Sequence, residues 1–269
     1  MSLVACAYGA DIEGESSSPA KRLDPLWRRT LPYEPTYILL EPGFGDRPHN
    51  AKFQLSVAFQ LLGDPLDASP DLAVRPDGLF VAYSQTSFWD LESESEPFYD
   101  TSYRPQIFWH QSLPGSVFNS SDLAIEAGYA HESNGQAGAD SRALNALFAR
   151  PLFAWEIGTG FLRVEPRVVL YLNDLPDNPD LPDYRGHLDL TVLGGTTDGW
   201  QLRAQARMAD VLEYSSLQLD LSHPISDWTG GWLHGYAYLQ SYLGYSESLL
   251  GYDQRSAQPR LLAGFGITR

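Results

Sequence analysis

The stretch "KFQLSVAFQLL", residues 52–62, alternates apolar and polar side chains along its whole length. Phe53, Leu55 and Val57 fall on one face of an extended chain, whereas Gln54 and Ser56 fall on the other. Successive side chains of a β-strand point to opposite faces of its sheet, so this period of two predicts a strand with one apolar face.

Segments with the same period follow one another from about residue 36 onward. They predict twelve strands, near residues 36–44, 52–62, 79–91, 104–113, 121–133, 142–155, 160–172, 184–196, 199–209, 214–225, 232–245 and 259–269. Before them, "GESSSPAKR" at residues 14–22 is polar and shows no apolar period. We therefore predict two parts, a flexible N-terminal segment over residues 1–35 and a β-domain over residues 36–269.

The composition excludes several classes of protein. A formal net charge of -16 over 269 residues repels nucleic acid. The single cysteine, Cys6, cannot form an internal disulfide. No stretch approaches the roughly 18 consecutive apolar residues that a membrane helix needs.

Two architectures could bury the apolar faces of these strands. A soluble sandwich would turn them inward, whereas an outer-membrane barrel would turn them toward lipid. Aromatic residues crowd the strand ends, as Trp89, Trp109 and Trp155 illustrate, and the polar faces mix Arg and Glu with Gln, Ser and Thr. A closed barrel also pairs every backbone group within lipid. We predict an all-β, twelve-stranded antiparallel transmembrane β-barrel with a polar interior, located in the cell outer membrane.

The stretch "YAHESNGQAGADSRALNALF", residues 129–148, places polar groups on the lipid face of that barrel. His131 and Ser133 share a face with Ile125, so both should point outward. A hairpin symmetric about Gly138 would set Asn145 opposite His131. Polar side chains facing hydrocarbon are costly and need a reason. For a single histidine, a position at the headgroup level would be reason enough, but three converging groups favour a site.

The chemistry of these residues fits acyl transfer. Ser133 would be the nucleophile, His131 the base that takes its proton, and Asn145 the group that orients the imidazole ring. The backbone N–H groups of Ser133 and Gly135 are candidates to hold the oxyanion.

The pattern H-x-S-N-G, a short loop and S-R-x-x-N closely resembles the active-site hairpin of the outer-membrane phospholipase A family. The segments "KFQLSVAF", "YSQTSFWDL", "EPFYDTSYRPQIF" and "DNPDLPDY" resemble that family's segments in the same order. The resemblance implies hydrolysis of acyl esters of membrane glycerophospholipids, including lysophospholipids, by a Ser-His-Asn triad on the outer wall. It also implies dependence on Ca²⁺ and activation by homodimerisation. A non-enzymatic barrel, such as a small porin or a structural protein, is the alternative function.

The resemblance also implies ligands for calcium. They are the carbonyl of Gln136, the hydroxyl of Ser141 and the hydroxyl of Ser95 from a partner subunit. Asp177 matches a ligand of a second, dimer-independent position, but Gly138 stands where the family has an aspartate, which puts that position in doubt. A solvated turn is the other explanation of Asp177.

Gln85 is the last residue of interest. It shares a face with Leu79 and Val81, so its amide should meet hydrocarbon, where unpaired polar groups are costly. A two-fold dimer would let two Gln85 amides pair across its interface. A slipped strand register that turns Gln85 into the lumen is the alternative.

Overall fold

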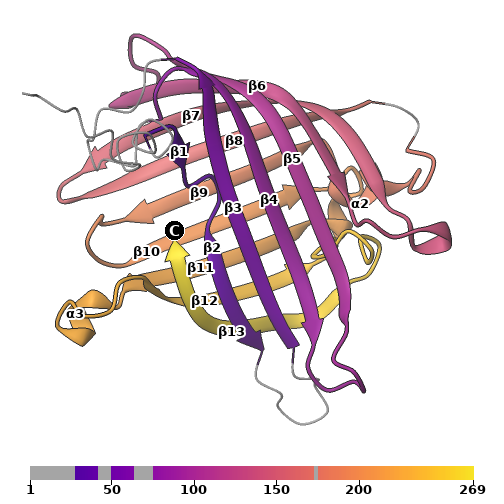
Figure 1. The fold of residues 1–269 in the computed structure, drawn as a ribbon. Coiled ribbons are helices and arrows are strands. Elements are labelled where there is room, and N and C mark those ends of the chain that lie inside the picture. Colours follow the sequence, from indigo (N-terminus) through magenta and orange to yellow (C-terminus); the bar gives the residue numbers. More distant parts are fainter. Residues whose placement is uncertain (1–27, 42–49, 64–74, 173–174) are drawn as a thin grey trace, which may run out of the picture.

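The computed structural model describes residues 28–41, 50–63, 75–172 and 175–269. Twelve long strands form one antiparallel sheet that closes on itself as a barrel (Figure 1). They are β2 (Thr36–Glu41), β3 (Asn50–Leu62), β4 (Gly78–Asp90), β5 (Phe98–Ser112), β6 (Asp122–Ser133), β7 (Ala143–Ile157), β8 (Gly160–Tyr171), β9 (Leu188–Gly195), β10 (Gln201–Met208), β11 (Ser216–Pro224), β12 (Tyr236–Gly244) and β13 (Ser256–Thr268). Each strand pairs with the next along the chain, and β13 pairs with β2 to close the ring. The predicted twelve-stranded antiparallel barrel is therefore confirmed.

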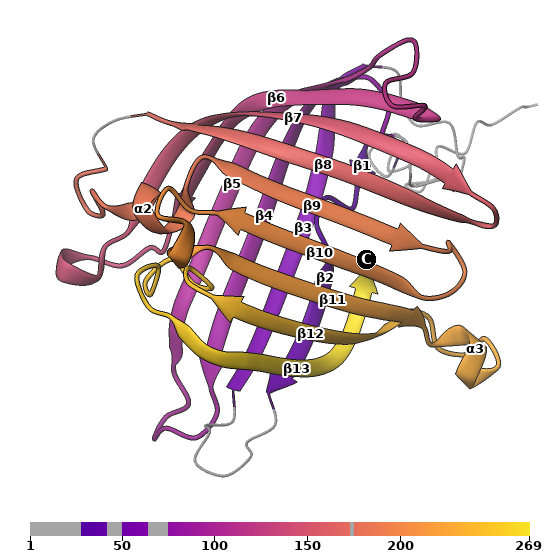
Figure 2. The same ribbon diagram turned by 180° about the vertical axis from the view of Figure 1, so that it is seen from behind.

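The helical elements are short and lie in the connections between strands. In the described residues, the α-helical turns are α2 (Leu181–Arg185) and α3 (Ser226–Thr229), which lie at opposite ends of the barrel (Figures 1 and 2). Two 3₁₀ turns, η1 (Gly138–Asp140) and η2 (Leu212–Tyr214), lie in strand connections. No helix in the described part of the chain is long and apolar enough to cross a membrane.

Three strand starts differ from the prediction by four residues or more. Strand β12 begins at Tyr236 rather than near residue 232. Strand β5 begins at Phe98 rather than near residue 104, because the residues from Phe98 to Tyr103 also pair with β4. Strand β9 begins at Leu188 rather than near residue 184, because the preceding residues form α2.

The N-terminal boundary of the barrel also differs. Strand β1 (Thr30–Leu31) pairs with β3 beyond the end of β2, with Thr30 opposite Phe59. The chain then enters the lumen, where Tyr33 stacks on Phe108 with 5.4 Å between ring centroids. Part of the segment that the sequence predicts as flexible is thus held by the barrel, whereas residues 1–27 lie outside the described residues.

The barrel wall is apolar outside and polar inside. Leu55 and Val57 on β3 are 52% and 38% exposed, whereas Ser56 and Gln60 on the same strand are buried. This arrangement is the reverse of a soluble sandwich, in which the apolar faces would be the buried ones. The prediction of a polar interior with lipid-facing apolar side chains is therefore confirmed.

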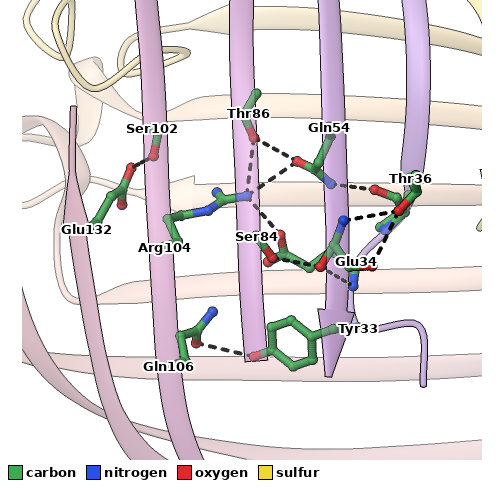
Figure 3. Close-up of polar contacts among 12 residues, drawn as sticks. Tyr33, Glu34, Thr36, Gln54, Ser84, Thr86, Ser102, Arg104, Gln106 and Glu132 are labelled. Carbon is green, nitrogen blue, oxygen red and sulfur yellow. Dashed lines mark hydrogen bonds and ion pairs between the residues drawn. The ribbon is translucent and has the colours of Figure 1, made fainter. Parts of the chain in front are cut away.

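Polar side chains reach across the lumen and bond to one another. The Arg104 guanidinium on β5 lies 2.8 Å from the Glu34 carboxylate, and the Tyr33 hydroxyl donates to Gln106 at 3.2 Å (Figure 3). Lys52 on β3 donates to Gln240 on β12 at 2.7 Å. One lumen cavity, whose lining includes Glu34, Lys52 and Arg104, has a volume of about 80 Å³, room for a few waters. A barrel crossed by such bonds is poorly suited to the porin alternative.

Candidate active site

The hairpin of β6 and β7 brings the predicted base and the predicted orienting residue together. His131 lies directly opposite Asn145 in the strand register, as symmetry about Gly138 predicts. His131 Nδ1 lies 2.9 Å from Asn145 Oδ1, within hydrogen-bond distance. Because the amide oxygen can only accept, Nδ1 carries the proton in this arrangement and Nε2 is the nitrogen with a lone pair.

Ser133 lies two residues beyond His131 on the same outward face of β6. Its backbone is flanked by Tyr103 of β5 and Ala143 of β7. Among the residues that the structure describes, the Ser133 hydroxyl makes no hydrogen bond to His131. The structure thus places the serine beside the His–Asn pair without joining it to them. Hydrogen bonds of catalytic groups are often long in ligand-free proteins and tighten when substrate binds.

The loop after Ser133 is held by Asn134, whose role the sequence did not reveal. Its buried side chain accepts hydrogen bonds from the backbone N–H groups of Gln136 and Arg142 and donates to the Asp140 carbonyl at 2.7 Å. These three bonds fix the loop from the inside. The only sequence signal was that asparagine often bonds to the backbone in turns.

Gly135 occupies a position that only glycine fits comfortably. Its φ is +69°, and a Cβ added there would lie 3.1 Å from the Tyr103 ring. The absence of a side chain keeps the backbone beside Ser133 open. That access is what an oxyanion donor at this position requires.

A second residue without a predicted role, Tyr129, joins the outward cluster. Its hydroxyl donates to Asn145 Oδ1 at 2.5 Å, the same atom that bonds to His131. The alternation of β6 placed Tyr129 on this face, but nothing in the sequence indicated its partner.

The predicted calcium ligands are only partly brought together within one chain. The Ser141 hydroxyl donates to the Asp177 carboxylate at 3.1 Å, which joins the β6–β7 loop to the loop before α2. The Gln136 carbonyl belongs to the loop that Asn134 fixes. Among the described residues, no group of three or more His, Cys, Asp and Glu side chains could hold a metal ion. The predicted set is of another kind, mostly hydroxyl and carbonyl oxygens.

Ser95 lies in the tight β4–β5 connection, where its φ is +72°. The Asp90 carboxylate accepts hydrogen bonds from the backbone N–H groups of Glu92 and Ser93 at 2.9 and 3.0 Å. Trp89 closes the other side by donating its indole N–H to the Glu96 carbonyl at 2.8 Å. The Ser95 backbone therefore has a defined conformation at the same barrel end as the β6–β7 loop.

The region around α2 supports the loop that carries Asp177. Tyr252 donates a hydrogen bond to Asp180 and stacks edge-on against Tyr184, with 5.7 Å between ring centroids. Burial raises the pKa of the Tyr252 hydroxyl, and the hydrogen bond to Asp180 raises it further. The hydroxyl therefore stays protonated and keeps donating to Asp180 at all ordinary pH values.

Gln85 points outward from β4, so the slipped register does not occur. Its amide is not left unpaired, however. The Tyr83 hydroxyl donates to Gln85 Oε1 at 2.9 Å, and Gln85 Nε2 donates to the Ser87 hydroxyl at 3.2 Å. The expectation that this amide lacks partners within its own chain is therefore wrong, because alternate residues of one strand share a face and can bond along it.

The arrangement has the parts of a nucleophilic hydrolase. A ring nitrogen with a lone pair lies on the same face as a serine hydroxyl, and a third group fixes the ring. All three side chains are on the wall that faces lipid, next to a loop kept open by glycine. An acyl chain lying along that wall could present its ester to them.

Comparisons with known proteins agree with this interpretation. The sequence profile of the phospholipase A1 family matches residues 32–268. Phospholipase A1 of Klebsiella pneumoniae is 35% identical over 214 residues, covering 77% of this chain and 67% of the relative. The solved outer membrane phospholipase A of Escherichia coli matches with a TM-score of 0.71 and 29% identity, covering 87% of this chain and 90% of that one.

A second solved structure, a Salmonella typhi outer membrane phospholipase dimer with bound calcium, also matches. It has a TM-score of 0.71 and 28% identity, and the match covers 88% of this chain and 91% of that one. Sequence, fold and the outward polar cluster point the same way: this chain belongs to the phospholipase A1 family and is an outer-membrane β-barrel enzyme.

Proposed function

We propose that this enzyme hydrolyses acyl ester bonds of membrane glycerophospholipids and lysophospholipids with Ser133, His131 and Asn145 as its triad. The observation that carries the proposal is the 2.9 Å contact between His131 Nδ1 and Asn145 Oδ1 on the lipid-facing wall, two residues from Ser133. An isolated histidine at a strand end has no need of a partner that fixes its tautomer. A histidine that acts as a general base does need such a partner.

The reaction follows from the proton positions. His131 Nε2 takes the proton of Ser133 while Ser133 Oγ attacks the ester carbonyl carbon, and the carbonyl oxygen becomes an oxyanion. The backbone N–H groups of Ser133 and Gly135 are the candidate donors to it. As the bond to the glycerol oxygen breaks, His131 returns the proton to that leaving oxygen. Water, deprotonated by His131, then attacks the acyl-serine, releases the fatty acid and restores Ser133.

Calcium and a second subunit are part of the same proposal. The Salmonella typhi relative is a dimer with bound calcium, which supports an equivalent arrangement here. The Gln136 carbonyl, the Ser141 hydroxyl and a Ser95 hydroxyl from the partner subunit are hard oxygen ligands of the kind calcium accepts. Asp177 contacts Ser141 and would belong to the second, dimer-independent position, where it would supply one negative charge. When bound, the ion would supply positive charge next to the developing oxyanion.

The dimer also gives the lipid-facing site a second wall. Gln85 lies on the outer surface of β4, two strands from β6, and is the proposed contact between subunits. Its in-chain bonds leave one amide hydrogen and one lone pair of the oxygen for the partner's glutamine.

The test is phospholipid hydrolysis by the detergent-solubilised protein, first with calcium and then with a chelator. We expect release of fatty acid that the chelator stops and that calcium restores. In parallel, an alkyl sulfonyl fluoride should label the wild type at Ser133 and leave Ser133→Ala unlabelled. A Ser133→Ala protein with near-full hydrolysis would refute the triad. A folded wild type with no hydrolysis and no labelling would favour a non-enzymatic barrel.

A further inference from the structure

One atom of the candidate triad has two hydrogen-bond donors. Asn145 Oδ1 lies 2.9 Å from His131 Nδ1 and 2.5 Å from the Tyr129 hydroxyl. Tyr129 and His131 are alternate residues on the outer face of β6, and Asn145 lies opposite His131 on β7. An amide oxygen has two lone pairs, so it can accept both hydrogen bonds at once.

The orientation of the Asn145 amide decides which nitrogen of His131 is protonated. An asparagine amide is nearly symmetric in shape, and a rotation of 180° exchanges its oxygen with its NH₂ group. In the rotated form the NH₂ group would donate to Nδ1, which must then lack a proton. The proton of neutral His131 would sit on Nε2, and the ring could not take the proton of Ser133.

The Tyr129 hydroxyl favours the productive orientation over the rotated one. In the productive form its hydrogen is bonded to Asn145 Oδ1. In the rotated form the phenol could accept from the NH₂ group, but its own hydrogen would face hydrocarbon without a partner. Leaving a donor unpaired away from water shifts such an equilibrium by on the order of tenfold or more.

We propose that Tyr129 is a positioning residue of the reaction: its hydroxyl holds the Asn145 oxygen toward His131 and thereby keeps Nε2 able to receive the Ser133 proton. The inference rests on the proposed function. It also explains how a neutral asparagine can do what an aspartate does in many triads. A carboxylate has two equivalent oxygens and needs no such guide, but it would place an anion next to lipid.

The equivalence of carboxylate oxygens provides the experiment. In the wild-type background, Tyr129→Phe should lower kcat by about tenfold and leave KM within about twofold, because the phenol contacts Asn145 and not the substrate. The rate of sulfonyl fluoride labelling at Ser133 should fall by the same factor. In an Asn145→Asp background, Tyr129→Phe should change both rates by less than about twofold, because rotating a carboxylate by 180° exchanges two equivalent oxygens.

A second measurement does not depend on turnover. Nitrogen-15 NMR of the histidine-labelled protein, with the His131 signals assigned by their loss in His131→Gln, reports which ring nitrogen carries the proton. We expect the Nδ1–H form in the wild type and a predominance of the Nε2–H form in Tyr129→Phe, since a tenfold loss of kcat requires that only about a tenth of the molecules keep the productive tautomer. Tyr214→Phe removes a phenol hydroxyl from the 3₁₀ turn η2 outside the candidate site and is the matched control. It should change neither the tautomer nor the rates.

Other outcomes would overturn the inference in distinguishable ways. A Tyr129→Phe protein with wild-type kcat and a single Nδ1–H tautomer would show that the phenol orients nothing. A raised KM at constant kcat would make Tyr129 a substrate contact instead. Equal losses in the wild-type and Asn145→Asp backgrounds would indicate a packing role. If the wild type is neither labelled nor active, the proposed function itself fails, and the role of Tyr129 falls with it.

Discussion

On the inner face of the β6–β7 hairpin, Glu132 carries a charge and is bonded to the Arg185 guanidinium at 2.7 Å and to the Ser102 hydroxyl. On the outer face, its neighbour His131 bonds to the neutral amide of Asn145, which also accepts a hydrogen bond from Tyr129. The two faces belong to the same strand, and successive side chains of β6 point alternately to one face and to the other. Both hold polar groups away from bulk water, the inner face inside the barrel and the outer face on the lipid-facing wall, yet they do so with different chemistry.

The difference follows from what each face meets. The lumen contains many cations and hydroxyls, so a carboxylate there can be neutralised within hydrogen-bond distance. The outer wall meets lipid or another subunit, where an unmatched charge is far more costly than a neutral hydrogen-bonded group. The nucleophilic chemistry proposed for this wall therefore uses only neutral groups: a serine, an imidazole, an amide and a phenol.

Removing the nucleophile should give the largest effect and should touch only the outer face. We expect Ser133→Ala to lower kcat by roughly three orders of magnitude or more, because triad members act as a unit. Its thermal midpoint in detergent should match that of the wild type, since the hydroxyl makes no described bond to His131. A large drop in stability would show that the outer face, like the inner one, supports the barrel.

Breaking the ion pair on the inner face should instead lower the stability of the barrel. Glu132→Ala leaves Arg185 buried without its partner, and we expect a loss of about 3–5 kcal/mol in the free energy of unfolding. Chemical denaturation in detergent measures it, and Arg185→Ala is the matched variant. The double variant should lose less than the sum of the two single ones. Additive losses would contradict the ion pair as the source of the stability.

The third prediction ranks two members of the outer cluster. In the proposed triad Asn145 orients the ring by one hydrogen bond, so Asn145→Ala should lose about 1–3 kcal/mol of transition-state stabilisation and keep measurable hydrolysis. His131→Ala should retain almost none, because the ring carries the proton itself. Rates in a continuous fatty-acid assay decide the ranking, and equal losses would contradict it.

Gln85 should give the smallest effect. Its amide already has two partners within its own chain, so Gln85→Ala should weaken the calcium-dependent dimer by about 1 kcal/mol. Cross-linking in detergent with calcium and an acyl sulfonyl fluoride measures the dimer fraction. A dimer yield equal to that of the wild type would remove Gln85 from the interface, and a monomer that is fully active would remove the dimer from the mechanism.

The sequence was informative wherever a period or a register determined the structure. Alternation predicted twelve strands and the two faces of each, and the symmetry of the hairpin about Gly138 predicted Asn145 opposite His131. These follow from geometry that every antiparallel hairpin shares. The same reasoning could not find β1 or the course of Tyr33 into the lumen, because the bonds of that segment are made with strands far along the chain.

Individual side-chain bonds were also beyond the sequence. Tyr129 and Gln85 were both placed on the correct face, but each side chain could have turned to any of several neighbours. Asn134 looked like an ordinary turn residue, and its three bonds inside the loop depend on where η1 brings the chain. The roles of the catalytic and calcium residues remain predictions that the experiments above address.

The candidate triad is contained in a single hairpin, and this has a consequence for the order of assembly. Residues 131 and 145 meet through a short loop, and hairpins of this kind form in about microseconds. The seam between β2 and β13 joins residues more than 200 positions apart, and non-local pairings of this type form late. A newly inserted chain can thus bring the candidate triad together before the pairing of β2 with β13 closes the barrel. If its activity requires a second subunit and calcium, half-assembled molecules remain harmless to the membrane into which they are folding.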